Sequence, residues 1–500
     1  MAGRDLIVIV IAIAVWEAAR FVTLRTLRRR WQRSIGDFLR RHNVQLEQFR
    51  FIDRVWVRQA LLQDPEIDRV AAGRAAETGQ TVGEVRARVE EYLDEIVPFF
   101  NLFSYYKLGA AAATSAVRLC YELWFDGDAL SRAREAVPAG AVTVYVSNHR
   151  SNADYVVLSV GAMRHVALSY AVGEWARVWP LDSLFRSFGS YFVRRGEKDP
   201  LYHTVLARYL QLVAARGLTT AFFLEGALSR DGALRAPKIG LLDYLVGILR
   251  HEPDREVYFV PVGVNFDRVL EDRNLVADAG ARAPSRMEKF LSLATIVARA
   301  PLILAAIVAR PNRRSHLKYG YAAVGFGKPI ALTTLMPNAV AIANLPDDPR
   351  RVEMAKLADG LLAEVGRVVP ATPVTVVCAA LVDGATDMPA LRASVRELLT
   401  SMRAAGRPLA FGAAYAATLA AREKSRDSSD DKASLDAEIM DAEEAERTID
   451  LALSLLKRRG LVRVEGGQVR VVERILVRYY ANSLLPPARF AARPAVLPVA

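Results

Sequence analysis

The sequence predicts an α/β protein whose mixed, largely parallel sheet is flanked by helices, with a helical N-terminal region and an α+β C-terminal region. Short β-rich runs alternate with helical segments in the middle of the chain, as in largely parallel sheets. Before residue 100 and after residue 370, apolar residues recur at helical spacing. A hairpin pattern centred on glycine, VRVEGGQVRVV, lies near the C-terminus.

Composition describes a folded chain with a basic surface. The 500 residues are 52% hydrophobic, too apolar for a disordered chain and enough for one large core plus a smaller helical domain. The formal net charge of +12 favours anionic partners such as nucleic acid, phosphorylated metabolites or an acidic membrane surface. No basic patch with interleaved aromatic side chains accompanies this charge, so we expect no nucleic-acid partner. Cys120 and Cys378 lie far apart, outside any metal or disulfide pattern, which favours a reducing cytoplasmic setting.

Residues 1–27 are a candidate membrane anchor. The apolar run LIVIVIAIAVW (6–16) is followed by the basic segment RTLRRRWQR. A membrane span needs about 20 apolar residues, so a marginal span, an interfacial anchor and a buried core helix all remain open. The basic flank favours the cytoplasmic side of a membrane, and its place after the apolar run argues against a cleaved signal peptide.

Residues 28–127 are expected to form a helical N-terminal domain and a membrane-associating helix. Segments such as VGEVRARVEEYLDEIVPFF carry apolar residues at helical spacing. The aromatic and apolar stretch 99–127 suits a helix in a core or against lipid.

Residues 128–345 are expected to form the α/β domain. Its strands are predicted at 141–146, 219–224, 257–264 and 319–326, separated by helical segments. The apolar stretch 290–309 is interrupted by Arg299 and Pro301, which suits two short interfacial helices or a core helix.

Residues 346–500 are expected to be helical, with a solvated polar linker at about 422–447 that grades into a helix. The tail then predicts a helix, the hairpin and a final aromatic helix.

Two side chains after the strand at 141–146 suggest catalysis. His149 and Asp154 fit a general-base pair, in which the carboxylate fixes the imidazole tautomer and stabilises the imidazolium. Their spacing alone is weak, because histidine and aspartate meet at this spacing by chance in many chains. A strand end places His149 at the carboxyl edge of the sheet, where α/β folds bind ligands, and Ser151 or Asn152 is available to cap the following helix.

A second loop, EGALSRDGALRAPKIG (225–240), also follows a strand. Glycines permit close backbone approach to a phosphate, while Arg230 and Lys238 provide charged donors. A solvated loop is the alternative, since single surface charges are common.

Four segments occur in the order of the acyltransferase motifs of the glycerolipid acyltransferase superfamily: NHRSNAD, GSYFVRR, FFLEGALSRDG and VPVGVNF. Together with GFGKPIAL and RYYANSLLPP, they most resemble the membrane glycerol-3-phosphate acyltransferases and their relative, dihydroxyacetone-phosphate acyltransferase. The likeness covers most of the chain and is strongest from about Tyr121 to Leu332.

This resemblance implies a fold and a set of roles. The α/β domain is expected to be glycerolipid acyltransferase-like. His149 is expected to deprotonate the sn-1 hydroxyl, Asp154 to orient His149, and the alkoxide to attack the acyl thioester directly. Residues expected to bind substrate are Arg195, Glu225, Gly226, Ser229, Arg230 and Lys238, and those expected to shape the motifs are Asn148, Arg150, Ser151, Gly189, Phe192 and Pro261.

One residue departs from the family pattern. Leu228 stands where the family usually has an arginine, and loss of a charge-assisted phosphate contact is worth about 1.5 to 3 kcal/mol. The identity of the acceptor is therefore open.

The expected function is that of a glycerol-3-phosphate 1-O-acyltransferase, which catalyses the first step of phospholipid synthesis with acyl-CoA or acyl-carrier protein as donor. We expect no cofactor and no metal, and an association with the cytoplasmic face of the cell membrane. Acylation of dihydroxyacetone phosphate or a lysophospholipid, and a non-catalytic lipid-binding homologue, are the alternatives.

Overall fold

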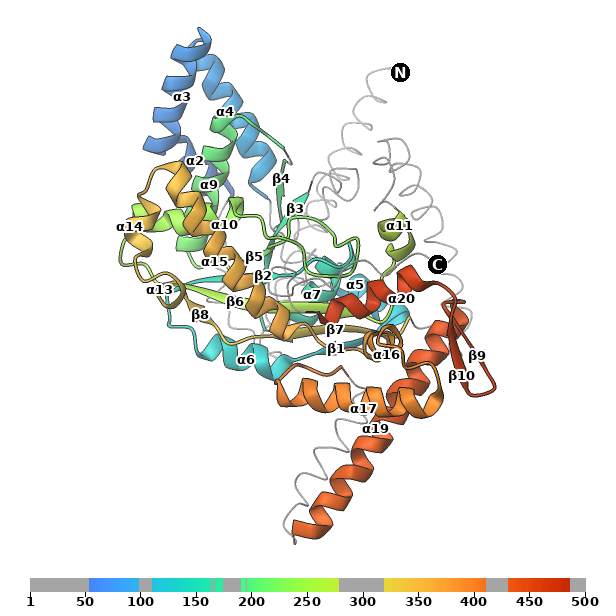
Figure 1. Ribbon diagram of the computed structural model, residues 1–500. Coiled ribbons are helices and arrows are strands. Elements are labelled where there is room, and N and C mark those ends of the chain that lie inside the picture. Colours follow the sequence, from blue (N-terminus) through green and yellow to red (C-terminus); the bar gives the residue numbers. More distant parts are fainter. Residues whose placement is uncertain are drawn as a thin grey trace, which may run out of the picture.

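The computed structural model describes residues 54–98, 110–162, 165–166, 168–173, 190–194, 196–277, 319–410 and 430–485. A sheet of eight strands crosses the middle of the molecule (Figure 1). The strands are β1 (Glu122–Phe125), β2 (Val142–Ser147), β3 (Ser169–Gly173), β4 (Tyr191–Val193), β5 (Thr220–Phe223), β6 (Val257–Phe266), β7 (Tyr321–Phe326) and β8 (Ile330–Ala331).

The sheet is mixed and largely parallel, as the sequence predicts. Its strand order is β1-β7-β6-β2-β5-β3-β4, and β8 pairs with β6. Strand β2 lies between β5 and β6 and is parallel to both, while β7 and β8 run antiparallel to β6. The carboxyl ends of the parallel strands therefore share one edge, and His149 follows β2 at that edge.

Helices cover both faces of the sheet, because its central strands are apolar on both sides. In β6, Val257 and Phe259 belong to one apolar cluster. Because successive side chains of a strand point to opposite faces of the sheet, Val260 and Val262 belong to the other cluster. The first cluster is covered by α2 (Arg54–Leu62), α3 (Pro65–Thr78), α4 (Val82–Ile96), α9 (Pro200–Ala215), α10 (Gly240–Val246), η4 (Gly247–Arg250), α13 (Leu332–Leu335), α14 (Ala339–Ala343) and α15 (Asp347–Val368).

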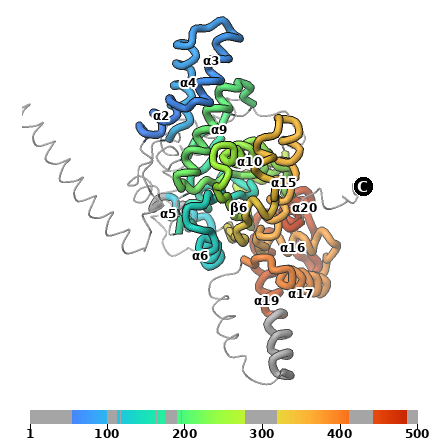
Figure 2. The backbone as a smooth tube through the Cα atoms, turned by 90° about the vertical axis from the view of Figure 1, so that its left-hand side faces the viewer, coloured from blue at the N-terminus to red at the C-terminus, as the bar shows by residue number. Residues whose placement is uncertain are grey.

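The second cluster joins the other face of the sheet to the C-terminal part of the chain. Its elements are α5 (Ala110–Cys120), α6 (Gly127–Glu135), α7 (Asp154–Ala162), α11 (Asp272–Ala277), α16 (Pro373–Val382), α17 (Met388–Ala404), α19 (Asp430–Arg458), β9 (Val462–Glu465), β10 (Gln468–Val471), α20 (Arg474–Ala481) and η5 (Asn482–Leu484). We call the elements from α16 to η5 the C-terminal module. Figures 1 and 2 place α3 and α4 at one end of the molecule and α19 at the other.

Local sequence signals fix the helical pair α3–α4. The Asp64 carboxylate accepts hydrogen bonds from the backbone N–H groups of Glu66 and Ile67 at the start of α3. The helix ends at Gly79, whose φ of 68° favours glycine. Thr81 and Glu84 then form a capping box that starts α4.

Several sequence predictions are confirmed, and some need correction. The four predicted strands, the helices before residue 98 and the C-terminal helix–hairpin–helix are present. Within the stretch 99–127, however, α5 ends at Cys120 and residues 122–125 form strand β1, because ELWF pairs with β7 at the sheet edge. Strands β3, β4 and β8 were not predicted. The described part of the polar segment 422–447, which begins at Asp430, is helical, and residues 422–429 lie outside the described residues.

The predicted anchor at 1–27 and the apolar segment at 290–309 lie outside the described residues. Among the helices that the structure does describe, none is both long and apolar enough to cross a bilayer.

Candidate active site

The turn after β2 is anchored to the neighbouring strand β6. The Asn148 side chain donates to the carbonyl oxygen of Val264 at 2.9 Å, and its own Oδ1 accepts from the Val264 N–H at 2.8 Å. Asn148 is fully buried, so this paired contact satisfies a side chain that would otherwise be costly to bury. The turn therefore leaves the sheet in a fixed direction.

His149 and Asp154 are in contact, as their spacing predicts. Nδ1 of His149 lies 2.9 Å from Oδ2 of Asp154, and both side chains are buried. The same carboxylate oxygen accepts the backbone N–H groups of Arg150 at 2.7 Å and Ser151 at 3.1 Å. Asp154 therefore holds both the imidazole ring and the turn that carries it.

Aromatic rings fix the plane of the imidazole. The Phe223 ring stacks on His149 with 4.0 Å between ring centroids and 12° between planes. Tyr155 meets the His149 ring edge-on at 5.7 Å. With Nδ1 directed at Asp154, the ring has little freedom to rotate, and Nε2 remains for a substrate proton.

Glu225 links the two loops at this edge of the sheet. One carboxylate oxygen accepts the backbone N–H of His149 at 2.8 Å, and the other accepts the backbone N–H of Arg235 at 2.7 Å. Burial raises the pKa of the Glu225 carboxyl to about 7, although the two N–H groups act in the opposite direction. Glu225 therefore supports the backbone of His149, whereas the family resemblance implied a role in substrate binding.

The remaining residues of the loop 225–238 have different surroundings. Ser229 is buried, its hydroxyl donates to the Ala233 carbonyl at 2.7 Å, and its N–H donates to the His149 carbonyl at 3.1 Å. Arg230 is exposed at the surface. Gly226 has a φ of 64°, and a Cβ there would lie 2.9 Å from Cγ of Lys238. The close approach of Lys238 to the loop thus requires glycine at 226.

Leu228, the departure from the family pattern, packs against the second apolar cluster. Its carbonyl oxygen accepts a hydrogen bond from Nη1 of Arg235 at 2.8 Å. A guanidinium group therefore lies beside position 228 even though the side chain there is apolar.

A cavity of about 520 Å³ opens beside His149. Its walls are largely apolar and aromatic, and Lys238 and Arg194 contribute cationic side chains. The lining also includes Tyr155, Ala171, Val172, Gly173, Val193, Tyr202, His203, Leu206, Phe222, Phe223, Gly226, Ala227, Leu241 and Tyr244. Such a mixture suits a ligand with a long apolar part and an anionic part.

Arg194 was missed by the sequence analysis, although it precedes the predicted Arg195. Its Nη2 lies 2.7 Å from Oε2 of Glu95 on α4, and its Nη1 lies 3.0 Å from Glu197. The N-terminal helices thus reach the wall of the cavity. No local sequence signal connects Glu95 with Arg194, because the contact depends on how α4 packs on the sheet.

The other predicted motif residues are distributed around this site. Arg150 is buried and donates to the Gly232 carbonyl, while the Ser151 hydroxyl donates to Glu271 at 2.7 Å. Phe192 is buried in β4, and Pro261 in β6 pairs with Val146 of β2. Gly189 and Arg195 lie outside the part of the chain that the structure describes.

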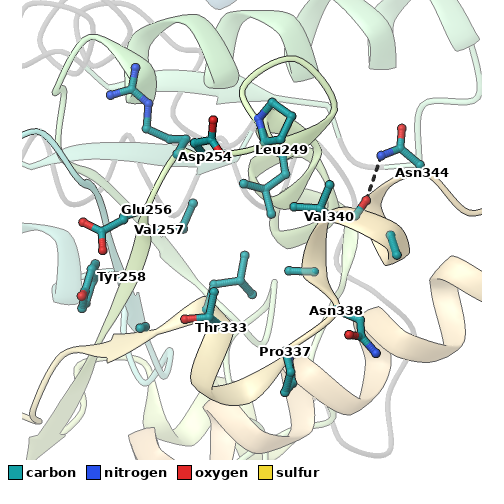
Figure 3. A pocket seen from close by; sticks show the side chains of 16 residues that line it. Leu249, Asp254, Glu256, Val257, Tyr258, Thr333, Pro337, Asn338, Val340 and Asn344 are labelled. Carbon is teal, nitrogen blue, oxygen red and sulfur yellow. Dashed lines mark hydrogen bonds between the residues drawn. The ribbon is translucent and has the colours of Figure 1, made fainter.

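A second cavity, of about 620 Å³, lies at the opposite edge of the sheet, where β6 begins (Figure 3). Glu256, Val257 and Tyr258 line it together with Asn338 and Val340. None of the residues predicted to act in catalysis or binding lines it, so the cavity beside His149 is the candidate active site. Over the described ranges, His, Cys, Asp and Glu form no group of three suited to a metal ion.

The structure thus brings a histidine held by an aspartate to the sheet edge, next to a largely apolar cavity. Residues 130–265 match the Acyltransferase family model, and residues 309–424 match the model for the glycerol-3-phosphate acyltransferase C-terminal region. The relationship to the glycerol-3-phosphate acyltransferases that the motifs predict is therefore confirmed.

Curated relatives agree with the two family models. The chain is 29% identical over 282 residues to a glycerol-3-phosphate acyltransferase of Aeromonas hydrophila and 31% identical over 290 residues to one of Glaesserella parasuis. These matches cover 55% and 56% of this chain but 32% and 33% of the relatives, so the chain matches about a third of their length.

One solved structure is also similar. It is the 1-acyl-sn-glycerophosphate acyltransferase PlsC from Thermotoga maritima, with 15% identity and a TM-score of 0.28 over 51% of this chain and 77% of that chain. A score this low carries no information about activity.

Proposed function

We propose that this protein is a glycerol-3-phosphate 1-O-acyltransferase that transfers a fatty acyl group from acyl-CoA or acyl-carrier protein to the sn-1 hydroxyl. The observation that carries the proposal is the His149 imidazole, which Asp154 holds through Nδ1 at the wall of a largely apolar cavity. The named relatives support glycerol 3-phosphate as the acceptor.

The proposed reaction needs one base and no acyl-enzyme. Because Nδ1–H of His149 donates to Asp154, the lone pair on Nε2 accepts the proton of the acceptor hydroxyl. The hydroxyl oxygen attacks the thioester carbonyl carbon, and the C–S bond breaks as the new ester forms. The proton on Nε2 then passes to the departing thiolate, which restores the neutral imidazole.

The cavity suggests where the two substrates bind. Apolar side chains such as Leu206, Phe222 and Leu241 suit the fatty chain of the donor. Of the predicted cationic residues that the structure describes, Lys238 lines the cavity and Arg230 does not, so we assign Lys238 to the acceptor phosphate. Because Leu228 replaces an expected phosphate-binding arginine, dihydroxyacetone phosphate and lysophospholipids are alternative acceptors. Comparing the rates of acyl transfer to the three acceptors decides among them.

We further propose that the reaction takes place at the cytoplasmic face of the cell membrane. The apolar run at 6–16, the basic segment after it and the lipid nature of donor and product support this location. Cell fractionation tests it, and recovery of the full chain in the soluble fraction alone would refute it.

Substitution of His149 tests the proposed function. General-base catalysis contributes about 10²- to 10⁴-fold, so we expect His149→Ala to lower kcat by at least about a hundredfold. Asp154→Asn should also lower kcat, because the amide does not stabilise the imidazolium as a carboxylate does. The assay measures acyl transfer from acyl-CoA and from acyl-carrier protein to glycerol 3-phosphate.

His251→Ala is the matched control, since His251 is exposed beyond α10 and outside the candidate site. We expect this control to keep the rate of the unmodified protein. Equal rates for His149→Ala and His251→Ala would rule out the proposed base.

A further inference from the structure

Two adjacent carboxylates after β6 connect the catalytic turn with the C-terminal module. Glu271 accepts the Ser151 hydroxyl at 2.7 Å and the Asn152 N–H at 3.2 Å. The next residue, Asp272, accepts hydrogen bonds from Arg459 at the end of α19 and from the Tyr480 hydroxyl on α20. The loop 269–272 therefore contacts the His149 turn on one side and α20 on the other.

The Tyr480 hydroxyl is the centre of this connection. Besides donating to Asp272, it accepts the Val269 N–H at 3.1 Å and an N–H of Arg459 at 2.9 Å. Burial and the nearby Asp272 carboxylate raise the pKa of Tyr480 well above its usual value, so the hydroxyl keeps its proton. A single buried oxygen thus fixes both ends of the loop 269–272.

A separate set of contacts holds α20 against the loop that follows β5. The Asn482 side chain donates to the Asp231 carbonyl at 2.8 Å. At Gly232, a Cβ would lie 1.8 Å from the Tyr479 carbonyl oxygen, which shows how closely the two backbones approach. The Arg150 guanidinium, which belongs to the catalytic turn, lies 5.1 Å from the centre of the Tyr479 ring. Figure 1 shows α20 beside α11, at the side of the sheet near α5.

We propose that Tyr480 is a positioning residue for acyl transfer, acting on the His149 turn through the loop 269–272 and Glu271. The C-terminal module then completes the active site without touching substrate. This inference rests on the proposed function, because it assigns a role in the same reaction. Small displacements of a catalytic base cost rate steeply, since the reacting atoms must meet within about 3 to 3.5 Å.

The neighbouring tyrosines provide a matched pair of variants. Tyr480→Phe removes the connecting hydroxyl and keeps the ring. Tyr479→Phe removes a hydroxyl that is buried but makes no hydrogen bond in the described part of the chain. We expect Tyr480→Phe to lower kcat about tenfold with both KM values within about twofold, and Tyr479→Phe to keep kcat within about twofold. A defect that only reduces the amount of folded protein would also lower activity. Such a defect would not, however, speed hydrogen exchange in the His149 turn alone.

Hydrogen exchange of the full chain gives a readout that does not depend on activity. In Tyr480→Phe, amides of residues 148–154 should exchange at least about fivefold faster than in Tyr479→Phe, while amides of α3 remain unchanged. Equal exchange of the turn in the two variants would overturn the inference, even if the protein proved inactive with every acceptor. Faster exchange in a protein without acyltransferase activity would support the coupling and refute the proposed function.

A double-mutant cycle adds a kinetic test in the active enzyme. Ser151→Ala removes the hydroxyl contact of the turn with Glu271 and leaves the contact of the Asn152 N–H in place. If the connection runs through Glu271, the two substitutions together should lower kcat by clearly less than the product of their separate effects. Effects that multiply would mean that Tyr480 acts independently of the turn, contrary to the inference.

Discussion

At the residue scale, two buried carboxylates divide the task of holding His149. Asp154 binds the imidazole ring, whereas Glu225 binds the backbone N–H of the same residue. Asp154 therefore sets the orientation of the ring, and Glu225 sets the path of the backbone. A substitution of Asp154 is expected to disturb the ring, and a substitution of Glu225 to disturb the backbone.

The pH dependence of stability should reveal the burial of Glu225. Its pKa is raised from 4.5 to about 7, so between these values the folded state binds more protons than the unfolded state. The free energy of unfolding therefore falls as pH rises through this window. Above the window, the titration of Glu225 causes no further change. Glu225→Gln lacks this titration. It also loses one backbone contact, because its amide nitrogen cannot accept an N–H.

We therefore expect the unmodified protein to be the more stable of the two at pH 5. That advantage should shrink by roughly 2 to 3 kcal/mol by pH 7.5. Urea unfolding of both proteins at the two pH values measures the change. An advantage that stays constant with pH would contradict the raised pKa.

Contacts between site residues could be predicted where the two residues lie close together in the sequence. His149 and Asp154 meet because a short turn and the first turn of α7 bring them together. The contacts of Arg194 with Glu95 and of Tyr480 with Asp272 join residues 99 and 208 positions apart. Such contacts depend on packing between elements, which no local spacing encodes.

At the element scale, Asp267 directly follows β6 and joins this strand to β7 and α16. Its carboxylate accepts the Tyr321 N–H at the start of β7, at 2.7 Å, and the Val374 N–H in the first turn of α16, at 2.9 Å. An anion at the start of a helix is also favourable for the helix dipole. The carboxylate thus fixes α16 against the end of the sheet.

Asp267→Ala should destabilise the protein by about 3 kcal/mol, because it leaves two buried N–H groups without an acceptor. Asp383→Ala is the control at the other end of α16, where the carboxylate is exposed and lies near the C-terminus of the helix. We expect this control to be neutral or slightly stabilising. Urea unfolding measures both, and equal losses of stability would argue against the role of Asp267.

Long, regular elements were predictable from the sequence, and short ones were not. Strands β2 and β6 are rich in β-branched and aromatic residues, which favour a strand buried on both faces. By contrast, β4 has three residues within a motif segment, and β1 has four residues and follows the helix α5 with a single residue between them. Pairing with β3 and β7 decides these short strands.

At the scale of the whole molecule, the C-terminal module shares a core with the sheet. One apolar cluster contains Val324 of β7, Val377 of α16 and Leu476 of α20. A similar cluster on the other face joins α15 to the same sheet. Apolar packing therefore continues across residues 345 and 346, where the sequence placed a domain boundary, and favours unfolding as one unit.

Leu476→Ala tests this coupling with a signal from a distant part of the chain. Leu476 is buried, and removal of its side chain should destabilise α20 by about 2 to 5 kcal/mol. All 6 tryptophans precede residue 180, so tryptophan fluorescence reports no residue of the C-terminal module. If the shared core makes the sheet and the module unfold together, Leu476→Ala should lower the free energy of unfolding equally by both probes. The probes are tryptophan fluorescence and far-UV circular dichroism, each followed through urea unfolding. An independent C-terminal domain would instead leave the fluorescence transition in place while part of the helical signal disappears at lower urea.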